Sequence, residues 1–165
     1  MQVLKNKEPI LSLEAAPVLL EEFGPNLETE MSKMLELMYA SGGVGLAGPQ
    51  VNISKRILVA DLSYVSNENY GYRSIKMVNP EVVSYSEEIV ESEEGCLSFP
   101  GLAIKVSRPV AVRVNFLSPL GERKEQTFID WSARIILHEI DHLNGVTLYS
   151  RASTLKRQRY NKRLK

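Results

Sequence analysis

The sequence predicts an α+β domain in which short antiparallel strands pack around a central helix, with a second, amphipathic helix near the N-terminus. Three features support this class: a helical apolar stripe in the first third of the chain, alternating strand patterns in the middle, and a second helical pattern towards the end. With 165 residues, 44% of them hydrophobic, the chain can form one well-buried core and is too short for us to expect two domains of equal size.

The N-terminal helix is expected over residues 25–41. Acidic residues Glu28 and Glu30 fall in its first turn, where they complement the helix dipole, and Gly42 and Gly43 follow its end. The apolar residues that form one stripe at helical spacing are Leu27, Met31, Met34, Leu35 and Met38. The pattern therefore predicts an amphipathic helix that ends at glycine.

The middle of the chain has the composition and alternation of short strands. Ser118 to Gly121 reads as a turn between two of them, and residues 66–71 look like an exposed loop. Strands are expected at residues 56–62, 75–80, 110–116 and 125–129. Short antiparallel strands joined by hairpins fit this pattern best.

The second helix is expected over residues 130–144, ending at Gly145, and it contains the sequence HEIDH. His138 and His142 are four residues apart, so both project from one helical face towards a common point, and Glu139 lies beside them. The alternative is a solvated helix face with no ligand. The apolar positions that would anchor the helix are Ala133, Ile136, Leu137 and Ile140.

A catalytic zinc-type site needs three protein ligands and an open position. Residues 143–165 contain no His, Asp, Glu or Cys, which excludes the common metalloprotease layouts with a downstream third ligand. The best upstream donor is the sole cysteine, Cys96, which predicts a site made of one cysteine and two histidines. A lone cysteine can also be a small buried hydrophobic residue, and that reading stays open for Cys96 by itself.

Residues 43–48 spell G-x-G-x-x-G, so a dinucleotide-binding loop has to be considered. That fingerprint follows a strand and opens a helix. Here it follows the predicted helix at 25–41, and the stretch before the next strand is too short for a new helix. The pattern alone is more typical of a glycine-rich helix end.

Three segments, GVGLAGPQ (43–50), EGCLS (94–98) and HEIDH (138–142), occur in this order and together resemble the signature motifs of peptide deformylases. The resemblance covers residues 1–150, which we expect to form a single catalytic domain. Residues 151–165 would then be a basic C-terminal tail, partly helical. One departure is Gly48, where the family usually has alanine, and we expect it only to loosen the loop.

The resemblance implies hydrolysis of the formyl group from the N-terminal formyl-methionine of nascent polypeptides, with release of formate. It implies one divalent metal ion per chain, Fe²⁺ in vivo with Zn²⁺, Ni²⁺ or Co²⁺ as alternatives, bound by Cys96, His138 and His142. Glu139 would act as general base. Two other readings stay open: a non-catalytic protein with a structural zinc ion, and a related N-acyl amidohydrolase.

The remaining site residues also follow from the resemblance. The Gln50 side-chain amide and the Leu97 backbone N–H would stabilise the oxyanion. Asp141 and Arg108 are expected to pair behind the site and hold the histidine helix. The nascent peptide would pair with the first motif, and its methionine would enter an apolar pocket; the residues assigned to substrate binding are Val44, Gly45, Gly95 and Ile135.

The charge is unevenly distributed along the chain. The chain has 20 basic and 20 acidic residues, but residues 151–165 contain no acid. Their basic residues are Arg151, Lys156, Arg157, Arg159, Lys162, Arg163 and Lys165. Such a cluster predicts docking to ribosomal RNA, and the alternative is a solvated helix end with no partner. Because the cluster lies outside the three motifs, we expect its removal to spare the chemistry. The absence of an apolar leader or span and the single cysteine predict a location in the cytoplasm, an organelle interior or the cytoplasm of a phage-infected host. The absence of a long heptad run or an extra apolar helix favours a monomer.

Overall fold

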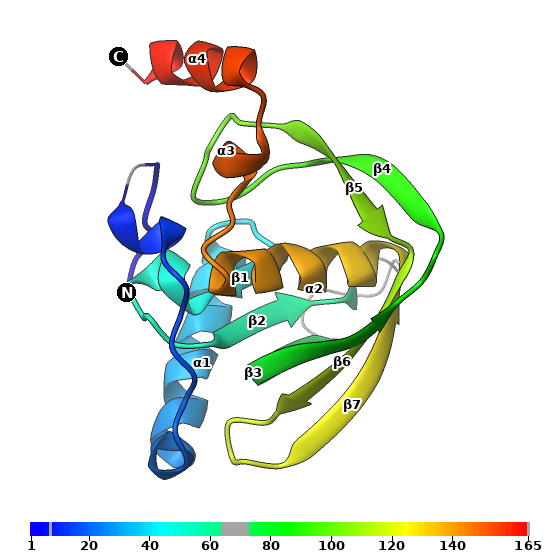
Figure 1. Cartoon of the computed structure of the whole chain (residues 1–165). Helices are drawn as coiled ribbons and strands as arrows, with labels where there is room; N and C mark the ends of the chain where they lie inside the picture. Colours follow the sequence, from blue (N-terminus) through cyan, green and yellow to red (C-terminus); the bar gives the residue numbers. More distant parts are fainter. Residues whose placement is uncertain (7, 64–72, 165) are drawn as a thin grey trace.

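The computed structural model describes residues 1–6, 8–63 and 73–164 and shows mixed helices and antiparallel strands (Figure 1). The predicted loop at 66–71 lies outside these residues. The helices are α1 (Pro25–Ala40), α2 (Asp130–Leu143), α3 (Leu148–Arg151) and α4 (Thr154–Arg163), with 3₁₀ turns at Pro9–Ser12, Leu20–Glu22 and Gly48–Val51. The strands are β1 (Gly45–Ala47), β2 (Ile57–Asp61), β3 (Ser74–Tyr85), β4 (Ile89–Glu94), β5 (Ile104–Pro109), β6 (Ala111–Leu117) and β7 (Arg123–Ile129).

The strands of the described residues form two antiparallel sheets. The larger has the order β1-β2-β3-β6-β7, and the smaller is the ribbon β4-β5. The predicted turn between β6 and β7 is present: the Gly121 N–H donates to the Ser118 carbonyl, and Gly121 has a φ of 90°. Figure 1 shows α2 lying between the larger sheet and the ribbon, so the predicted α+β arrangement around a central helix is confirmed.

Helix α1 matches its prediction to within one residue. Pro25 occupies its first turn, where a missing N–H has no cost, and Gly42 follows its end with a φ of 70°. Four of the five predicted apolar residues are buried, and Leu35 is half-buried; the buried ones are Leu27, Met31, Met34 and Met38. Helix α1 therefore covers β1 and β2 with the face that the sequence indicates.

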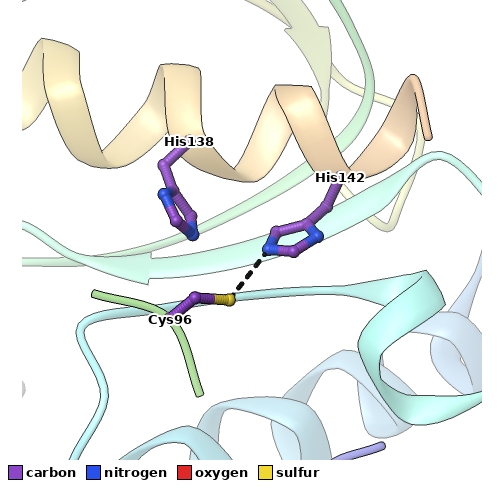
Figure 2. Close-up of side chains that lie close together, drawn as sticks. All are labelled: Cys96, His138 and His142. Atoms are coloured by element: carbon purple, nitrogen blue, oxygen red, sulfur yellow. Dashed lines mark hydrogen bonds between the residues drawn. The ribbon is translucent and has the colours of Figure 1, made fainter. Parts of the chain in front are cut away.

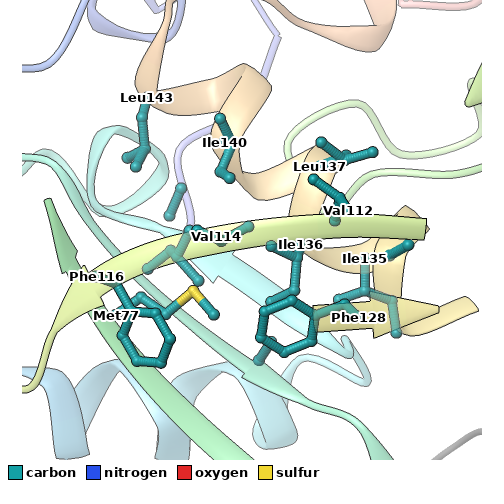
Figure 3. Packing of buried hydrophobic residues seen from close by; sticks show 14 of the residues in the cluster. Met77, Val112, Val114, Phe116, Phe128, Ile135, Ile136, Leu137, Ile140 and Leu143 are labelled. Carbon is teal, nitrogen blue, oxygen red and sulfur yellow. The ribbon is translucent and has the colours of Figure 1, made fainter. Parts of the chain in front are cut away.

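Helix α2 forms the centre of the main hydrophobic core (Figure 3). Its predicted apolar residues are buried against the inner faces of β2, β3, β6 and β7, with neighbours that include Met77, Val112, Val114, Phe116 and Phe128. Each fully buried side chain of this size contributes roughly 1.5–3 kcal/mol, so this face fixes the position of the helix. Gly145, with a φ of 69°, follows its end as predicted.

The C-terminal segment packs on the body of the protein. Tyr160 of α4 is only 4% exposed, and its hydroxyl donates to the Asn6 side chain at 2.6 Å. The Phe99 and Tyr149 rings stack with centroids 5.9 Å apart, and Tyr160 packs against both. Phe99 lies three residues beyond Cys96, so these rings contact the loop that follows β4 and carries Cys96, the cysteine loop. The expectation that removal of the segment spares the chemistry stays a prediction.

No helix among residues 1–6, 8–63 and 73–164 combines the length and apolar character needed to cross a bilayer.

Candidate metal centre

Cys96, His138 and His142 come together as the sequence predicts (Figure 2). Their candidate ligand atoms all lie within 4.8 Å of one another, and Cys96 Sγ is 3.2 Å from His142 Nε2. The histidines face one point because they are one turn apart on α2. The cysteine approaches from the loop after β4, where a turn closed by the Phe99 N–H and the Cys96 carbonyl holds it.

This cluster fits a divalent metal ion. A thiolate and two imidazoles suit Fe²⁺ or Zn²⁺, and bond lengths of roughly 2.3 Å to sulfur and 2.0–2.1 Å to nitrogen at a tetrahedral angle place such ligands about 3.5 Å apart. Cys96 Sγ and His142 Nε2 are 3.2 Å apart, and all the candidate ligand atoms lie within 4.8 Å of one another, so the cluster is compact enough to hold one ion. Three protein ligands leave a coordination position open, which is typical of catalytic rather than structural sites.

A cavity of about 480 Å³ lies beside the cluster. Its lining residues come from α2, β1 and the cysteine loop, so segments that are far apart in the sequence lie together around it. All ten predicted site residues except His142 line this cavity: Val44, Gly45, Gln50, Gly95, Cys96, Leu97, Ile135, His138 and Glu139. Trp131 and Arg134 line it as well.

Glu139 points into this cavity next to the glycine of β1. A Cβ atom on Gly45 would lie only 2.3 Å from Glu139 Oε1, so glycine makes room for the carboxyl group. Glu139 is 4% exposed, and its Oε2 atom has no hydrogen-bond partner among the described residues. Burial raises the pKa of Glu139 to about 7, although His138 and Arg108 act to lower it. The group can therefore accept and release a proton near neutral pH.

Gln50 is held rigidly against the cysteine loop. Its Oε1 atom accepts a hydrogen bond from the Ala47 N–H at 2.8 Å, which directs its Nε2 atom to Ser98 Oγ at 3.1 Å and Cys96 Sγ at 3.6 Å. The side chain is 1% exposed. The amide donor is therefore fixed beside the sulfur atom.

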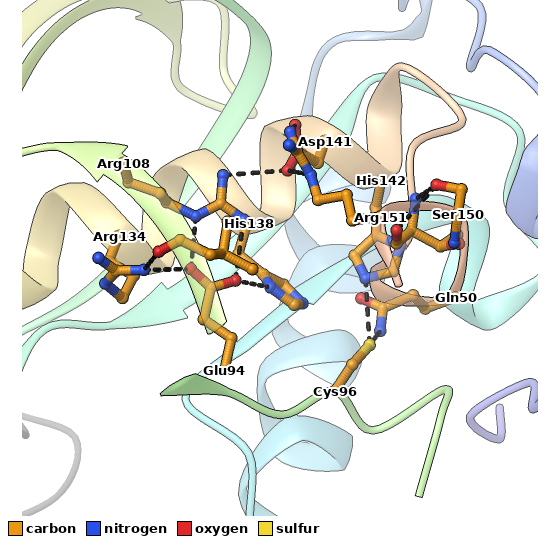
Figure 4. A network of polar contacts seen from close by, with 12 residues as sticks. Gln50, Glu94, Cys96, Arg108, Arg134, His138, Asp141, His142, Ser150 and Arg151 are labelled. Atoms are coloured by element: carbon orange, nitrogen blue, oxygen red, sulfur yellow. Dashed lines mark hydrogen bonds and ion pairs between the residues drawn. The ribbon is translucent and has the colours of Figure 1, made fainter. Parts of the chain in front are cut away.

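A buried ionic network lies behind the histidines (Figure 4). The predicted Arg108–Asp141 pair is confirmed at 3.0 Å. The centre of the network is Glu94, which the sequence analysis did not single out. The Glu94 carboxylate accepts hydrogen bonds from Arg108 Nε at 2.5 Å, Arg108 Nη2 at 2.9 Å and Arg134 Nη1 at 2.7 Å. It also faces His138 Nδ1 at 3.0 Å. Contact with Nδ1 leaves His138 Nε2 for the cluster.

The two histidines have different electrostatic surroundings. Burial acts to lower the pKa of His138, but hydrogen bonds with Cys96 and Glu94 raise it to about 10. Burial and the nearby charges of His138 and Arg108 lower the pKa of His142 well below its usual value. Burial acts to raise the pKa of Glu94, but hydrogen bonds from Arg108 and His138 lower it to about 2. The groups around His138 thus favour its protonated form, whereas those around His142 favour its neutral form.

Gly48 clarifies the role of the first motif. The motif follows α1 and leads into β1 and a four-residue 3₁₀ turn, so it lacks the context of a dinucleotide-binding loop, as the sequence predicts. A Cβ atom on Gly48 would lie 2.7 Å from the Lys55 carbonyl and 2.8 Å from the Ile53 carbonyl. Gly48 therefore permits close backbone packing, and the expectation that it only loosens the loop is wrong.

Comparison with known proteins identifies the family. The polypeptide deformylase family model matches residues 1–158. The chain is 38% identical to the peptide deformylase of Thermotoga petrophila over 157 residues, covering 95% of this chain and 90% of the relative.

Solved structures give the same result. The Plasmodium falciparum peptide deformylase matches with a TM-score of 0.87 and 34% identity, covering 99% of this chain and 92% of that one. The Met-Ala-Ser-bound class I type b peptide deformylase of Acinetobacter baumannii matches with a TM-score of 0.82 and 37% identity, covering 92% and 98%. The chain therefore belongs to the polypeptide deformylase family, whose metal-dependent members remove the N-formyl group from nascent peptides.

Proposed function

We propose that Cys96, His138 and His142 hold one divalent metal ion, Fe²⁺ in the cell, with Zn²⁺, Ni²⁺ or Co²⁺ as substitutes. The observation that carries the proposal is the convergence of one sulfur and two imidazoles within 4.8 Å beside a cavity that also contains Glu139. When bound, such an ion polarises a carbonyl group and lowers the pKa of a coordinated water molecule towards roughly 7.

Glu139 is the general base and acid of the reaction in this proposal. It takes a proton from the attacking water and passes one to the departing amine. Its position in the cavity, its Oε2 atom without a hydrogen-bond partner among the described residues, and a pKa near neutrality support this role. Glu139 does not belong to the ligand cluster, so its loss would affect turnover and leave the ligands in place.

The Gln50 amide and the Leu97 backbone N–H stabilise the oxyanion that forms on the formyl group. The rigid position of Gln50 Nε2 beside Cys96 supports this assignment, because a fixed donor needs no reorganisation during the reaction.

The peptide pairs along Val44 and Gly45. Strand β1 is at the edge of the sheet order β1-β2-β3-β6-β7, where an extended peptide can add as a further strand. The methionine side chain then enters the cavity near Ile135, which Gly95 also lines. The Acinetobacter baumannii relative was solved with Met-Ala-Ser bound, which is the peptide expected after deformylation of formyl-Met-Ala-Ser.

Formate release from formyl-Met-Ala-Ser, compared with acetate release from acetyl-Met-Ala-Ser, tests the proposal. We expect the metal-loaded protein to hydrolyse the formyl peptide selectively, and Glu139→Ala to retain one metal ion per chain with almost no turnover. Equal hydrolysis of both peptides would favour a broader N-acyl amidohydrolase. Metal binding with no hydrolysis of either would favour the structural zinc alternative.

We further propose that the chain docks at the ribosome through its basic C-terminal segment. Arg159, Lys162 and Arg163 of α4 are exposed, whereas Arg151 is paired with Asp141. A group of exposed basic side chains binds phosphate-rich RNA, because binding releases the counterions of the phosphates.

Because Tyr160 anchors α4, charge variants test ribosome docking better than truncation. The variant Arg159→Gln/Lys162→Gln/Arg163→Gln should lose a salt-dependent affinity for ribosomes and keep turnover of formyl-Met-Ala-Ser. Equal affinity of the variant and the wild type across a salt series would contradict docking through α4. A monomeric, cytoplasmic protein is also part of the proposal, and light scattering of the purified chain tests the monomer.

A further inference from the structure

We infer that Arg134 is a positioning residue for the metal centre, because it joins the strand that leads into Cys96 to the helix that carries both histidines. The inference rests on the metal site proposed above and adds a residue that the three motifs do not contain. Arg134 lies four residues before His138 on α2, so the two side chains share one face of the helix.

The Arg134 guanidinium is buried and makes three hydrogen bonds to other elements. Its NH1 group donates to Glu94 Oε1 at 2.7 Å and to the Val106 carbonyl of β5 at 2.8 Å. Its NH2 group donates to the Val90 carbonyl of β4 at 2.6 Å. The side chain is 8% exposed, and the Trp131 ring covers the guanidinium at 5.7 Å. One side chain of α2 therefore holds both strands of the ribbon.

The ribbon needs such an anchor. It has only two strands, and a two-stranded sheet is marginally stable by itself. Strand β4 ends at Glu94, two residues before Cys96, so movement of β4 relative to α2 would carry the cysteine away from the histidines. The three bonds of Arg134 resist that movement.

Arg134 also determines how Glu94 meets His138. Arg108 binds both oxygens of the Glu94 carboxylate, and Arg134 takes the remaining position on Oε1. This leaves Oε2 directed at His138 Nδ1, 3.0 Å away. Without Arg134, one acceptor position of a buried carboxylate would be unfilled, and the carboxylate could turn away from the ring. Arg134 thus acts on the cysteine through β4 and on one histidine through Glu94.

A merely structural role makes a different prediction from a positioning role. Removal of Arg134 leaves the Val90 and Val106 carbonyls without this donor, which destabilises the metal-free and metal-loaded forms equally. A positioning role also predicts weaker metal binding, so the metal-loaded form loses more stability than the metal-free form. Changes to groups that orient metal ligands typically reduce metal affinity about 10- to 100-fold.

The test compares zinc affinity, measured by competition with a chelating dye, in the wild type, Arg134→Met and Arg134→Lys. Arg113→Met is the control, since Arg113 is an exposed arginine of β6 that forms an ion pair with Glu125 at 3.8 Å. Melting of the metal-free and metal-loaded forms is measured in parallel. We expect affinity to fall about 10- to 100-fold in Arg134→Met, by less in Arg134→Lys, which keeps one donor for Glu94, and not at all in the control.

Unchanged zinc affinity in Arg134→Met, with equal loss of stability in both forms, would overturn the inference. If Arg134→Met does not fold, Arg134→Lys decides the question by the same comparison, and wild-type affinity in that variant overturns the inference. Failure of the wild type itself to bind one metal ion per chain would instead refute the metal site, so the two failures are distinguishable.

Discussion

Substitution of Gly45 by alanine should reduce turnover without removing the metal. Gly45 lies in β1 directly opposite Glu139, the proposed general base. The added Cβ atom would lie 2.3 Å from Glu139 Oε1 and 2.8 Å from Cδ, whereas ordinary van der Waals contact begins near 3.4 Å. The carboxyl group would therefore have to move by about 1 Å.

The expected loss follows from that displacement. A misplacement of about 1 Å in a catalytic group can cost about 10²-fold in rate, which corresponds to roughly 2.7 kcal/mol of transition-state stabilisation. The displacement of Glu139 should lower kcat, because Glu139 is assigned to proton transfer. Any effect of the added methyl group on peptide pairing along Gly45 should appear in KM. Metal content should remain at one ion per chain, because neither residue belongs to the ligand cluster.

Steady-state formate release from formyl-Met-Ala-Ser measures this effect in Gly45→Ala, Glu139→Asp and the double variant. The shorter aspartate makes room for the added methyl group, so the two losses should not add, and the coupling should be about 0.5–3 kcal/mol. A kcat for Gly45→Ala within about threefold of wild type, against the expected 10², would refute the steric argument. Additive losses in the double variant would refute it as well.

Four further predictions follow from the same contacts. Cys96→Ser should not retain a metal ion, since the chain has no other cysteine; full occupancy by elemental analysis would contradict the ligand assignment. Gln50→Ala should lower kcat about 10²- to 10³-fold, as expected for one oxyanion donor, and a normal rate would remove that role. Tyr160→Ala should lower the free energy of unfolding by about 3 kcal/mol in urea, because it empties a buried aromatic site; no change would mean that α4 does not anchor the body. The Fe²⁺ enzyme should lose activity in aerated buffer while the Ni²⁺ form persists, and days of stability in air would argue against iron bound by a thiolate.

The sequence predicted best where local periodicity specifies geometry. The bounds of α1 and α2 match the predictions to within one residue, because apolar stripes and glycines define both helices. The HEIDH spacing places His138 and His142 on one face for the same reason. Cys96 could be singled out because it is the sole cysteine and because residues 143–165 contain no His, Asp, Glu or Cys.

The ribbon β4-β5 was not predicted, because β4 has the sequence IVESEE, which lacks the alternation of apolar and polar residues that indicates a half-buried strand. Glu93 and Glu94 are adjacent and identical, and only packing buries one of them and exposes the other. The four-residue spacing of Arg134 and His138 was visible, but it gave no sign of which groups the arginine would meet.

The sequence by itself therefore determined the two long helices, the candidate ligands and the family motifs, since these depend on residue type and on spacing within one element. Only the tertiary structure decided that Glu94 faces His138, that Arg134 holds the ribbon, that Gly45 makes room for Glu139, and that α4 is anchored through Tyr160. These contacts join segments far apart in the chain. They depend on how sheets and helices pack, which no local periodicity specifies.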